Sequence, residues 1–291
     1  MKKISIFLLL LIPFSACTGK LGEDKGEDID PSGYTIFQVD TESLQIAGSD
    51  VAGAWKNGDR IGVFGSEKGE NVPYYLKKSG DGLQAAAFYG GVVKGDVQAY
   101  FPYAEGVVAG SGTIPCELET VQAFDPDAAP AEYFLKYNPR TFASLGPDGI
   151  LHFRYPMGML DVTIGFDDPI TVKGMVLNSS AGISGRLDVD KDGNVVDSGL
   201  AHKYITMSLG DTPVPSRAGD SFAHFFFVLP PKSYGAGELS LVVSSGEEDD
   251  IHIVIRDLVI QRVESSDFPV TSIVVGTSDI PSYDKENGYF E

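Results

Sequence analysis

The fold can be inferred from one short stretch of sequence, Trp55-Lys56-Asn57-Gly58-Asp59-Arg60-Ile61-Gly62-Val63-Phe64. Asn57-Gly58-Asp59 has the composition of a turn, because glycine tolerates positive φ angles and Asn and Asp side chains bond to nearby backbone. Ile61, Val63 and Phe64 then predict a β-strand. Trp55 is expected to bury its ring beside that strand, so the stretch predicts a loop, a turn and a buried strand.

Similar signals recur along most of the chain. Short apolar runs with period-2 alternation are separated by clusters of Gly, Pro, Asp and Asn, which predicts many strands joined by turns. The predicted strands are Tyr34–Asp40, Arg60–Phe64, Val97–Tyr100, Leu151–Phe153, Leu160–Ile164, Ile170–Asn178, Gly185–Asp190, Tyr204–Leu209, Phe222–Leu229, Leu239–Ser244, Ile251–Arg256 and Thr271–Val275. No window predicts a long amphipathic helix, although residues 126–142 are compatible with a helical turn or two. This pattern is typical of all-β proteins built from β-sandwiches.

The length of 291 residues favours two domains. A boundary is expected near Phe166-Asp167-Asp168-Pro169, because Asp-Pro restarts the chain in an extended conformation. We therefore predict an N-terminal β-sandwich over residues 34–165 and a C-terminal β-sandwich with a polar tail over residues 166–291.

The N-terminus has the plan of a secretory signal peptide over residues 1–16. Lys2 and Lys3 form a basic start, and residues 4–14 are apolar but too short to span a bilayer comfortably. Ser15-Ala16-Cys17 resembles a bacterial lipobox, which implies that Cys17 becomes the acylated first residue. The alternative is a plain secretory signal cleaved near Ala16, with Cys17 as an ordinary thiol.

Residues 17–33 are small, charged and almost free of apolar side chains. Such a segment cannot bury enough surface to offset its ordering entropy, so it is predicted to be a flexible acidic tether. Acidic residues soon after the lipid-bearing cysteine also resemble the export signals of Bacteroidetes-type surface lipoproteins. A merely solubilising linker explains the same composition.

The whole chain is strongly acidic, with 41 Asp and Glu against 22 Lys and Arg and a net charge of −19. It has no basic footprint for nucleic acid and no polybasic patch for anionic lipid. Apart from Cys17 the sequence contains a single cysteine, Cys116, which is expected to be a small buried apolar residue.

Four segments together resemble a known family. The string at 55–64 reads W-x-x-G-D-x-I-G-V-F, and Ala99-Tyr100-Phe101-Pro102-Tyr103 reads A-Y-F-P-Y. Residues 151–160 resemble an F-x-H-x-x-x-x-L segment with the His before the Phe, and residues 225–231 form an aromatic strand that ends in Pro-Pro. These segments, in this order, resemble the fimbrillin-like family, the subunits and anchors of Bacteroidetes type V pili. The family's usual closing G-x-x-Y strand is not recognisable here.

The resemblance implies two transthyretin-like β-sandwich domains in tandem. It also implies a lipoprotein anchored in the outer membrane, exposed at the cell surface as part of a fimbrium, and joined to other fimbrial subunits by β-strand exchange. Its further partners would be glycans or proteins on host or bacterial surfaces.

In this family a protease usually trims an N-terminal segment after an arginine. The natural candidate for the removable or groove-filling strand is the run that contains Tyr34, Ile36, Phe37 and Val39. The first arginine after Cys17, however, is Arg60, inside the motif strand itself. The strand is therefore expected either to be removed by another protease between about residues 40 and 54, or to be retained in an anchoring or terminal subunit.

No enzymatic motif is present. The sequence lacks a G-x-S-x-G elbow, an H-E-x-x-H helix and a P-loop, and its four histidines are dispersed. The chain is therefore expected not to be an enzyme and to need no cofactor.

Asp188-Val189-Asp190-Lys191-Asp192-Gly193 has the spacing of a calcium loop, with Asp188, Asp190 and Asp192 as candidate ligands. The twelfth position of such a loop would be Gly199, which cannot supply the usual carboxylate. The simpler interpretation is a β-hairpin whose turn is Lys191-Asp192-Gly193-Asn194, and this is the one we favour.

Aromatic residues raise a second class of function. Those of the first half are Tyr74, Tyr75, Phe88, Tyr89, Tyr100, Phe101 and Tyr103. Exposed rings on a β-sandwich could stack on sugars, so a glycan-binding surface lipoprotein is the alternative function. Core packing explains the same residues equally well.

The lipobox makes a direct prediction for Cys17. A metabolic fatty-acid probe should label the wild-type protein and not a Cys17→Ala variant, because Cys17 is the residue that would carry the lipid. Equal labelling of the two proteins would contradict a lipid anchor at this residue.

Overall fold

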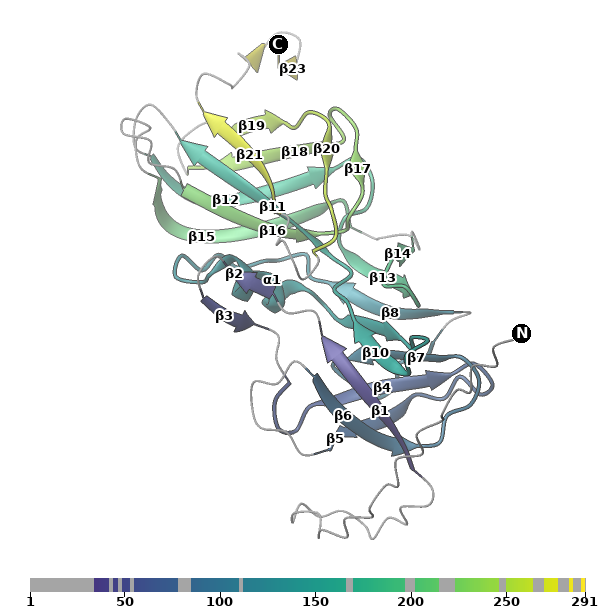
Figure 1. The fold of residues 1–291 in the computed structure, drawn as a ribbon. Helices are drawn as coiled ribbons and strands as arrows, with labels where there is room; N and C mark the ends of the chain where they lie inside the picture. Colours follow the sequence, from purple (N-terminus) through teal and green to yellow (C-terminus); the bar gives the residue numbers. More distant parts are fainter. Residues whose placement is uncertain are drawn as a thin grey trace, which may run out of the picture. The chain divides into compact units, whose positions relative to one another are not determined.

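The computed structural model describes residues 34–41, 44–46, 49–52, 55–77, 85–109, 112–165, 170–196, 202–214, 223–245, 250–263, 270–276, 283–284 and 289–290. Strands make up nearly all the regular secondary structure of this part of the chain, which confirms the predicted all-β class (Figure 1). One helix, α1 (Pro130–Tyr137), lies within the range where a helical turn was expected. No described helix has the length and apolar character needed to cross a bilayer.

The strands follow the predicted runs closely and add several that the sequence pattern did not reveal. They are β1 (Tyr34–Thr41), β2 (Leu44–Ile46), β3 (Ser49–Ala52), β4 (Arg60–Gly65), β5 (Val72–Leu76), β6 (Ala85–Gly91), β7 (Val97–Phe101), β8 (Thr113–Leu118), β9 (Thr141–Ser144), β10 (Ile150–Phe153), β11 (Gly158–Gly165), β12 (Ile170–Ser179), β13 (Gly185–Asp190), β14 (Val195–Val196), β15 (Tyr204–Val214), β16 (Ala223–Leu229), β17 (Ser233–Tyr234), β18 (Leu239–Ser244), β19 (Ile251–Val254), β20 (Leu258–Val259), β21 (Val270–Gly276), β22 (Tyr283–Asp284) and β23 (Tyr289–Phe290).

The first half forms a seven-stranded sheet of order β10-β1-β6-β5-β4-β7-β9. The two ends of this order also meet. Phe142 and Arg154 exchange backbone hydrogen bonds of 3.0 and 2.8 Å, and an isolated bridge joins Leu145 to Leu151. The hairpin between β9 and β10 therefore closes the sheet on itself.

The 55–64 motif lies in the core of this sheet. The Trp55 side chain is only 3% exposed. Its ring centroid lies 4.9 Å from that of Phe88, 5.0 Å from that of Phe101 and 5.4 Å from that of Phe153. Because these three rings come from β6, β7 and β10, Trp55 packs against strands from widely separated parts of the sheet.

The turn before β4 has the expected chemistry. Gly58 has φ of +92°, which a residue with a side chain rarely adopts. The backbone N–H of Lys56 donates to Oδ2 of Asp59 at 2.7 Å, and the N–H of Asp59 returns a bond to the Lys56 carbonyl at 3.1 Å. Burial raises the pKa of Asp59, although its bond from Lys56 acts in the opposite direction.

Strand β4 separates two hydrophobic clusters. Ile61 and Val63 point into the cluster that contains Trp55. Gly62 and Phe64 point to the other face, where a Cβ at Gly62 would collide with the ring of Tyr100. Phe64 stacks on that ring at 5.8 Å and belongs to the second, larger cluster.

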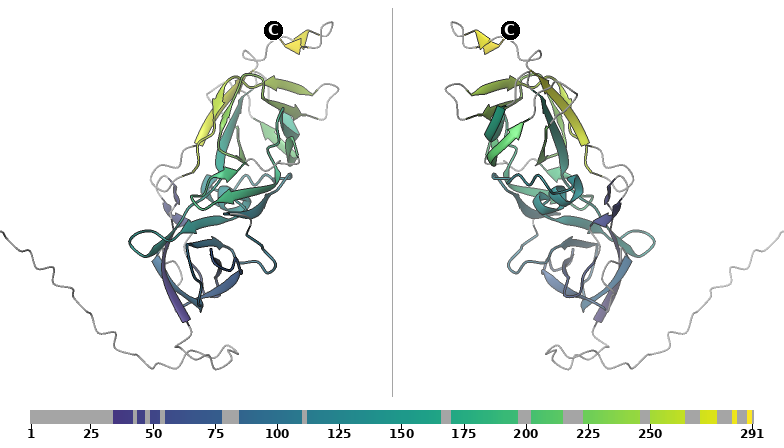
Figure 2. Two further views of the ribbon diagram at one scale, coloured as in Figure 1. Left: turned by 90° about the vertical axis from the view of Figure 1, so that its right-hand side faces the viewer. Right: turned by 90° about the vertical axis from the view of Figure 1, so that its left-hand side faces the viewer.

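Two sheets of the second half face each other as layers (Figure 1 and Figure 2), with strand orders β16-β11-β21 and β15-β12-β18-β19. Their inward side chains share one hydrophobic cluster. The contributing residues include Leu160, Val162, Phe225, Phe227, Met175, Leu177, Ile205, Met207, Leu241 and Val243. This arrangement is that of a β-sandwich.

Hydrogen bonds cross the position of the predicted boundary at residue 166. Strand β11 precedes it but pairs with β16 and β21, and β8 pairs with β13 from Gly185↔Leu118 to Asp190↔Thr113. Buried residues of β8 and α1, including Cys116 and Phe134, lie in the same cluster as the sandwich core. The sheets of the two halves therefore share strands and core across this position.

The packing of Trp55 generates a stability prediction. Trp55→Ala should lower the free energy of unfolding by about 3–5 kcal/mol, because it leaves a cavity among three rings. Tyr75→Ala is the matched control, since its ring is 42% exposed, and it should cost about 1 kcal/mol or less. Denaturant unfolding followed by circular dichroism measures both, and similar losses would show that Trp55 does not hold the core together.

Candidate functional site

Strand β1 contains the residues proposed for strand exchange, and it is paired along both of its edges. On one side it runs antiparallel to β6, from Tyr34↔Gly91 to Asp40↔Ala85. On the other side its second half runs parallel to β10, from Gln38↔Ile150 to Thr41↔Phe153. β1 thus lies between two strands that follow much later in the chain.

The side chains of β1 alternate between the core and the outer face. Phe37 and Val39 are 7% and 1% exposed and belong to the Trp55 cluster. Ile36, on the opposite face, is 48% exposed. The strand therefore inserts one row of apolar side chains into the first half, which is the pattern of a strand that fills a groove.

The ring of Tyr74 packs against that of Phe37, and their centroids lie 5.5 Å apart. The Tyr74 ring lies against Gly90, where a Cβ would collide with it. The Tyr74 hydroxyl donates to the carbonyl of Gly91, and burial raises the pKa of Tyr74. The hydrogen bond of the Tyr74 hydroxyl therefore fixes the position of the ring against which Phe37 packs.

At the C-terminal end of β1, His152 of β10 lies between two carboxylates. Its Nε2 is 2.9 Å from Oδ2 of Asp148, and its Nδ1 is 3.6 Å from Oδ2 of Asp40. The hydrogen bond from His152 and the backbone N–H of Ile150 hold the pKa of Asp148 below its ordinary value. All three side chains are well exposed, so these pairs position the strand end and stabilise it little.

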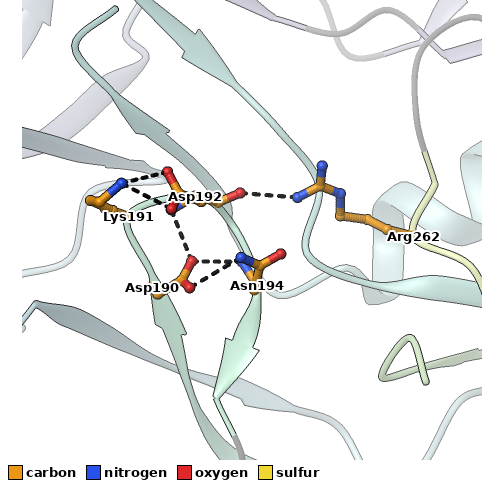
Figure 3. Close-up of polar contacts among 5 residues, drawn as sticks. All are labelled: Asp190, Lys191, Asp192, Asn194 and Arg262. Atoms are coloured by element: carbon orange, nitrogen blue, oxygen red, sulfur yellow. Dashed lines mark hydrogen bonds and ion pairs between the residues drawn. The ribbon is translucent and has the colours of Figure 1, made fainter. Parts of the chain in front are cut away.

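The aspartates with calcium-loop spacing lie elsewhere, on the hairpin of β13 and β14 (Figure 3). Oδ1 of Asp190 accepts hydrogen bonds from the backbone N–H groups of Asp192 at 2.8 Å and Asn194 at 2.9 Å. Its Oδ2 accepts a bond of 3.1 Å from the side-chain amide of Asn194. The Asp190 carboxylate therefore organises the turn.

The rest of this turn is also occupied by internal contacts. Nζ of Lys191 lies 2.8 Å from Oδ1 of Asp192, and Nη1 of Arg262 donates to the Asp192 carbonyl at 3.0 Å. Gly193 supplies the positive φ of +80°. A shallow cavity of about 340 Å³ beside the turn is lined by Gly193, Asn194, Val195, Pro231 and Arg262.

The spacing of Asp188, Asp190 and Asp192 is thus accounted for by a hairpin. Asp188 lies within β13 opposite Val196. Within the described ranges, no three His, Cys, Asp or Glu side chains are arranged to hold a metal ion. Gly199 lies outside the described residues. The hairpin that the sequence favoured over the calcium loop is the observed structure of residues 188–196.

The aromatic residues of the first half divide into core and surface. Tyr74, Phe88 and Tyr100 are fully buried and pack the core. Tyr75 is 42% exposed, and its ring lies 5.9 Å from the partly exposed ring of Tyr89. Only part of the aromatic set is therefore in a position to meet a sugar.

Of the two cysteines, the structure describes Cys116. Cys17, like the rest of the leader and tether, lies outside the described residues. Cys116 is a free thiol buried on β8, and burial raises its pKa to about 12. Such a thiol is a packing residue and not a nucleophile.

No protein-family model and no curated protein sequence matches the chain. Several solved structures are similar to it. A proposed cell adhesion protein from Parabacteroides distasonis is 10% identical with a TM-score of 0.47, over 83% of this chain and 93% of that chain. A proposed cell adhesion protein from Bacteroides ovatus is 13% identical with a TM-score of 0.45, over 79% and 89%.

The tip fimbrial protein Mfa3 from Porphyromonas gingivalis, with a C-terminal truncation, is 11% identical with a TM-score of 0.37, over 77% of this chain and 81% of that chain. The names of these structures refer to cell adhesion and to fimbriae.

The hairpin generates a pH-dependent prediction. Burial raises the pKa of Asp190, but the bonds from Asn194 and Asp192 and the Lys191 charge outweigh it, so the pKa lies below its ordinary value of 3.8. Asp190→Ala should therefore lower stability at pH 7 by about 1 kcal/mol at most, because solvent screens the bonds of this largely exposed carboxylate. The difference should disappear as the pH falls through the lowered pKa, where the wild-type carboxylate becomes protonated.

Asp192→Ala is the matched control, because its carboxylate pairs only with exposed Lys191 among the contacts of the turn, and it should change stability little. Thermal unfolding with and without Ca²⁺ completes the test. A large calcium-dependent stabilisation that is lost in both variants would favour the calcium loop instead.

Proposed function

We propose that this chain is a surface-exposed lipoprotein that serves as a structural, anchoring or adhesive subunit of a type V-like fimbria and contacts its neighbour by β-strand donation. The proposal rests on the sequence motifs at 55–64 and 99–103 together with the placement of β1. A non-enzymatic, cofactor-free role is part of it.

The observation that carries the proposal is the insertion of β1 between β6 and β10. Removing β1 would leave two strands with unpaired backbone groups and would open the pockets of Phe37 and Val39. Such a groove suits an extended segment of another subunit, because backbone groups supply affinity and alternate side chains supply specificity. A protein that keeps its own β1 has this groove filled, so it would accept no strand there and would act as a terminal or anchoring subunit.

The position of Arg60 favours retention of β1. Arg60 begins β4, where it pairs with Tyr75, and its carbonyl accepts the N–H of Tyr103 at 2.9 Å. Its guanidinium lies over the Tyr103 ring at 5.3 Å. A cut after this residue would pass through an interior strand of the sheet, so arginine-directed trimming would destroy the first half instead of opening a groove.

We therefore propose that the subunit keeps its lipid and its first strand and occupies an anchoring or terminal position. The mature N-terminus decides this point. Mass spectrometry of protein from outer membranes and from sheared fimbriae should find a start at acylated Cys17 in both fractions. A start downstream of Val39 in the fimbrial fraction would contradict the anchor and indicate a polymerising subunit, and absence from that fraction would contradict the fimbrial role.

A variant can supply the missing cleavage site. Thr41→Arg places an arginine at the end of β1, and Thr41→Lys is its matched control with the same charge. In the native host the arginine variant alone should yield trimmed protein if an arginine-directed protease acts on this chain.

A further inference from the structure

A short extended segment, Thr120–Phe124, lies along the edge of the second half's sandwich. It runs parallel to β15, the last strand of the β15-β12-β18-β19 sheet. The N–H of Thr206 donates to the Thr120 carbonyl at 2.7 Å, and the N–H of Gln122 donates to the Thr206 carbonyl at 2.9 Å. This segment, which we call the strap, thus continues the sheet beyond β15.

The strap also reaches the opposite layer through one side chain. Gln122 is completely buried. Its Nε2 donates to the carbonyl of Val228 at 2.8 Å, and its Oε1 accepts the N–H of Val228 at 2.8 Å. Val228 lies in β16, the edge strand of the β16-β11-β21 sheet. One carboxamide therefore replaces the strand that would otherwise pair with β16 at this point.

Two aromatic residues hold the strap in place. The Tyr137 hydroxyl of α1 accepts the N–H of Ala123 at 2.6 Å and is 3.1 Å from its carbonyl. The ring of Phe124 packs 5.1 Å from that of Phe225. The strap is therefore fixed by backbone pairing, by a side-chain bridge and by an aromatic contact, all within five residues.

We propose that the space between β15 and β16 is a peptide-binding slot, which the chain fills with its own strap. The slot selects an extended segment that carries a carboxamide in the middle and an aromatic ring two residues later. A carboxamide has one donor and one acceptor in the arrangement of a peptide group, whereas a carboxylate has no donor and an apolar side chain has neither. This requirement explains why a glutamine is buried here.

Because the strap of the same chain occupies the slot, the slot is closed to other chains. A covalently attached strap has an effective concentration on the order of millimolar, so a free peptide competes with it poorly. Loss of the Gln122 carboxamide leaves the buried N–H and carbonyl of Val228 without these partners, which weakens the strap. A free peptide that carries the glutamine then restores both bonds and gains an advantage over the altered strap.

The experiment uses the full chain and a fluorescent peptide with the sequence of residues 118–125, Leu-Glu-Thr-Val-Gln-Ala-Phe-Asp. Fluorescence anisotropy should show binding to Gln122→Ala at least about tenfold tighter than to the wild type. A peptide with Glu in place of Gln should bind at least about tenfold more weakly to the same variant. Gln261→Ala, which removes an exposed glutamine, is the control and should behave like the wild type.

Tyr137→Phe is the second variant, because it removes the hydroxyl that holds Ala123 and keeps the ring. If Gln122→Ala fails to fold, peptide binding to Tyr137→Phe tests the slot in its place. Equal binding of the Gln and Glu peptides would overturn the carboxamide selection. Absence of peptide binding by a variant that circular dichroism shows to be folded would overturn the slot.

Discussion

The structure depends on one constraint: the backbone N–H and C=O groups at the edges of its sheets need partners, since unpaired edges bind other chains. The chain provides partners for these edge groups in two ways. The first sheet closes on itself, because Phe142 and Arg154 join β9 to β10. The second half instead lays the strap along β15 and uses the side chain of Gln122 to satisfy Val228 of β16. Backbone closure of one sheet and side-chain pairing at one edge of another therefore coexist in one protein.

The two kinds of closure differ in how easily they open. β1 is bonded along both edges and buries Phe37 and Val39 among the residues that surround Trp55. Its release would break two ladders and expose a core pocket at once. The strap contributes a few backbone bonds, one carboxamide and the ring of Phe124. The strap therefore makes fewer contacts than β1 and is the weaker of the two closures.

Local sequence signals predicted the elements well, because strand periodicity and turn residues are short-range properties. Gly185–Asp190 and Leu239–Ser244 have the predicted bounds, and the hairpin turn lies where it was expected, closed by backbone hydrogen bonds of Asp190 with Gly193 and Asn194. β8 was not predicted from the sequence, because Pro115 argues against a central strand. In the structure β8 is an edge strand of the β14-β13-β8 sheet. Nothing in the neighbourhood of Gln122 marks it as a bridge, since its partner Val228 is over a hundred residues away. The candidate strand β1 was located from its composition, but its parallel pairing with β10 is a long-range contact that no local pattern encodes.

Local signals also say little about how the segments on either side of the predicted boundary at residue 166 pair with each other. A turn composition such as Asp-Pro marks where one strand ends, but it does not tell which sheet the strand joins. β11 ends there and lies between β16 and β21, and β8, the strap and α1 pack on strands that follow it. Because buried side chains from both sides of residue 166 form a single cluster, the second half cannot bury its core without the first. The strap, whose Gln122 bonds to Val228, lies in this shared region, so its contacts join residues from both sides of residue 166.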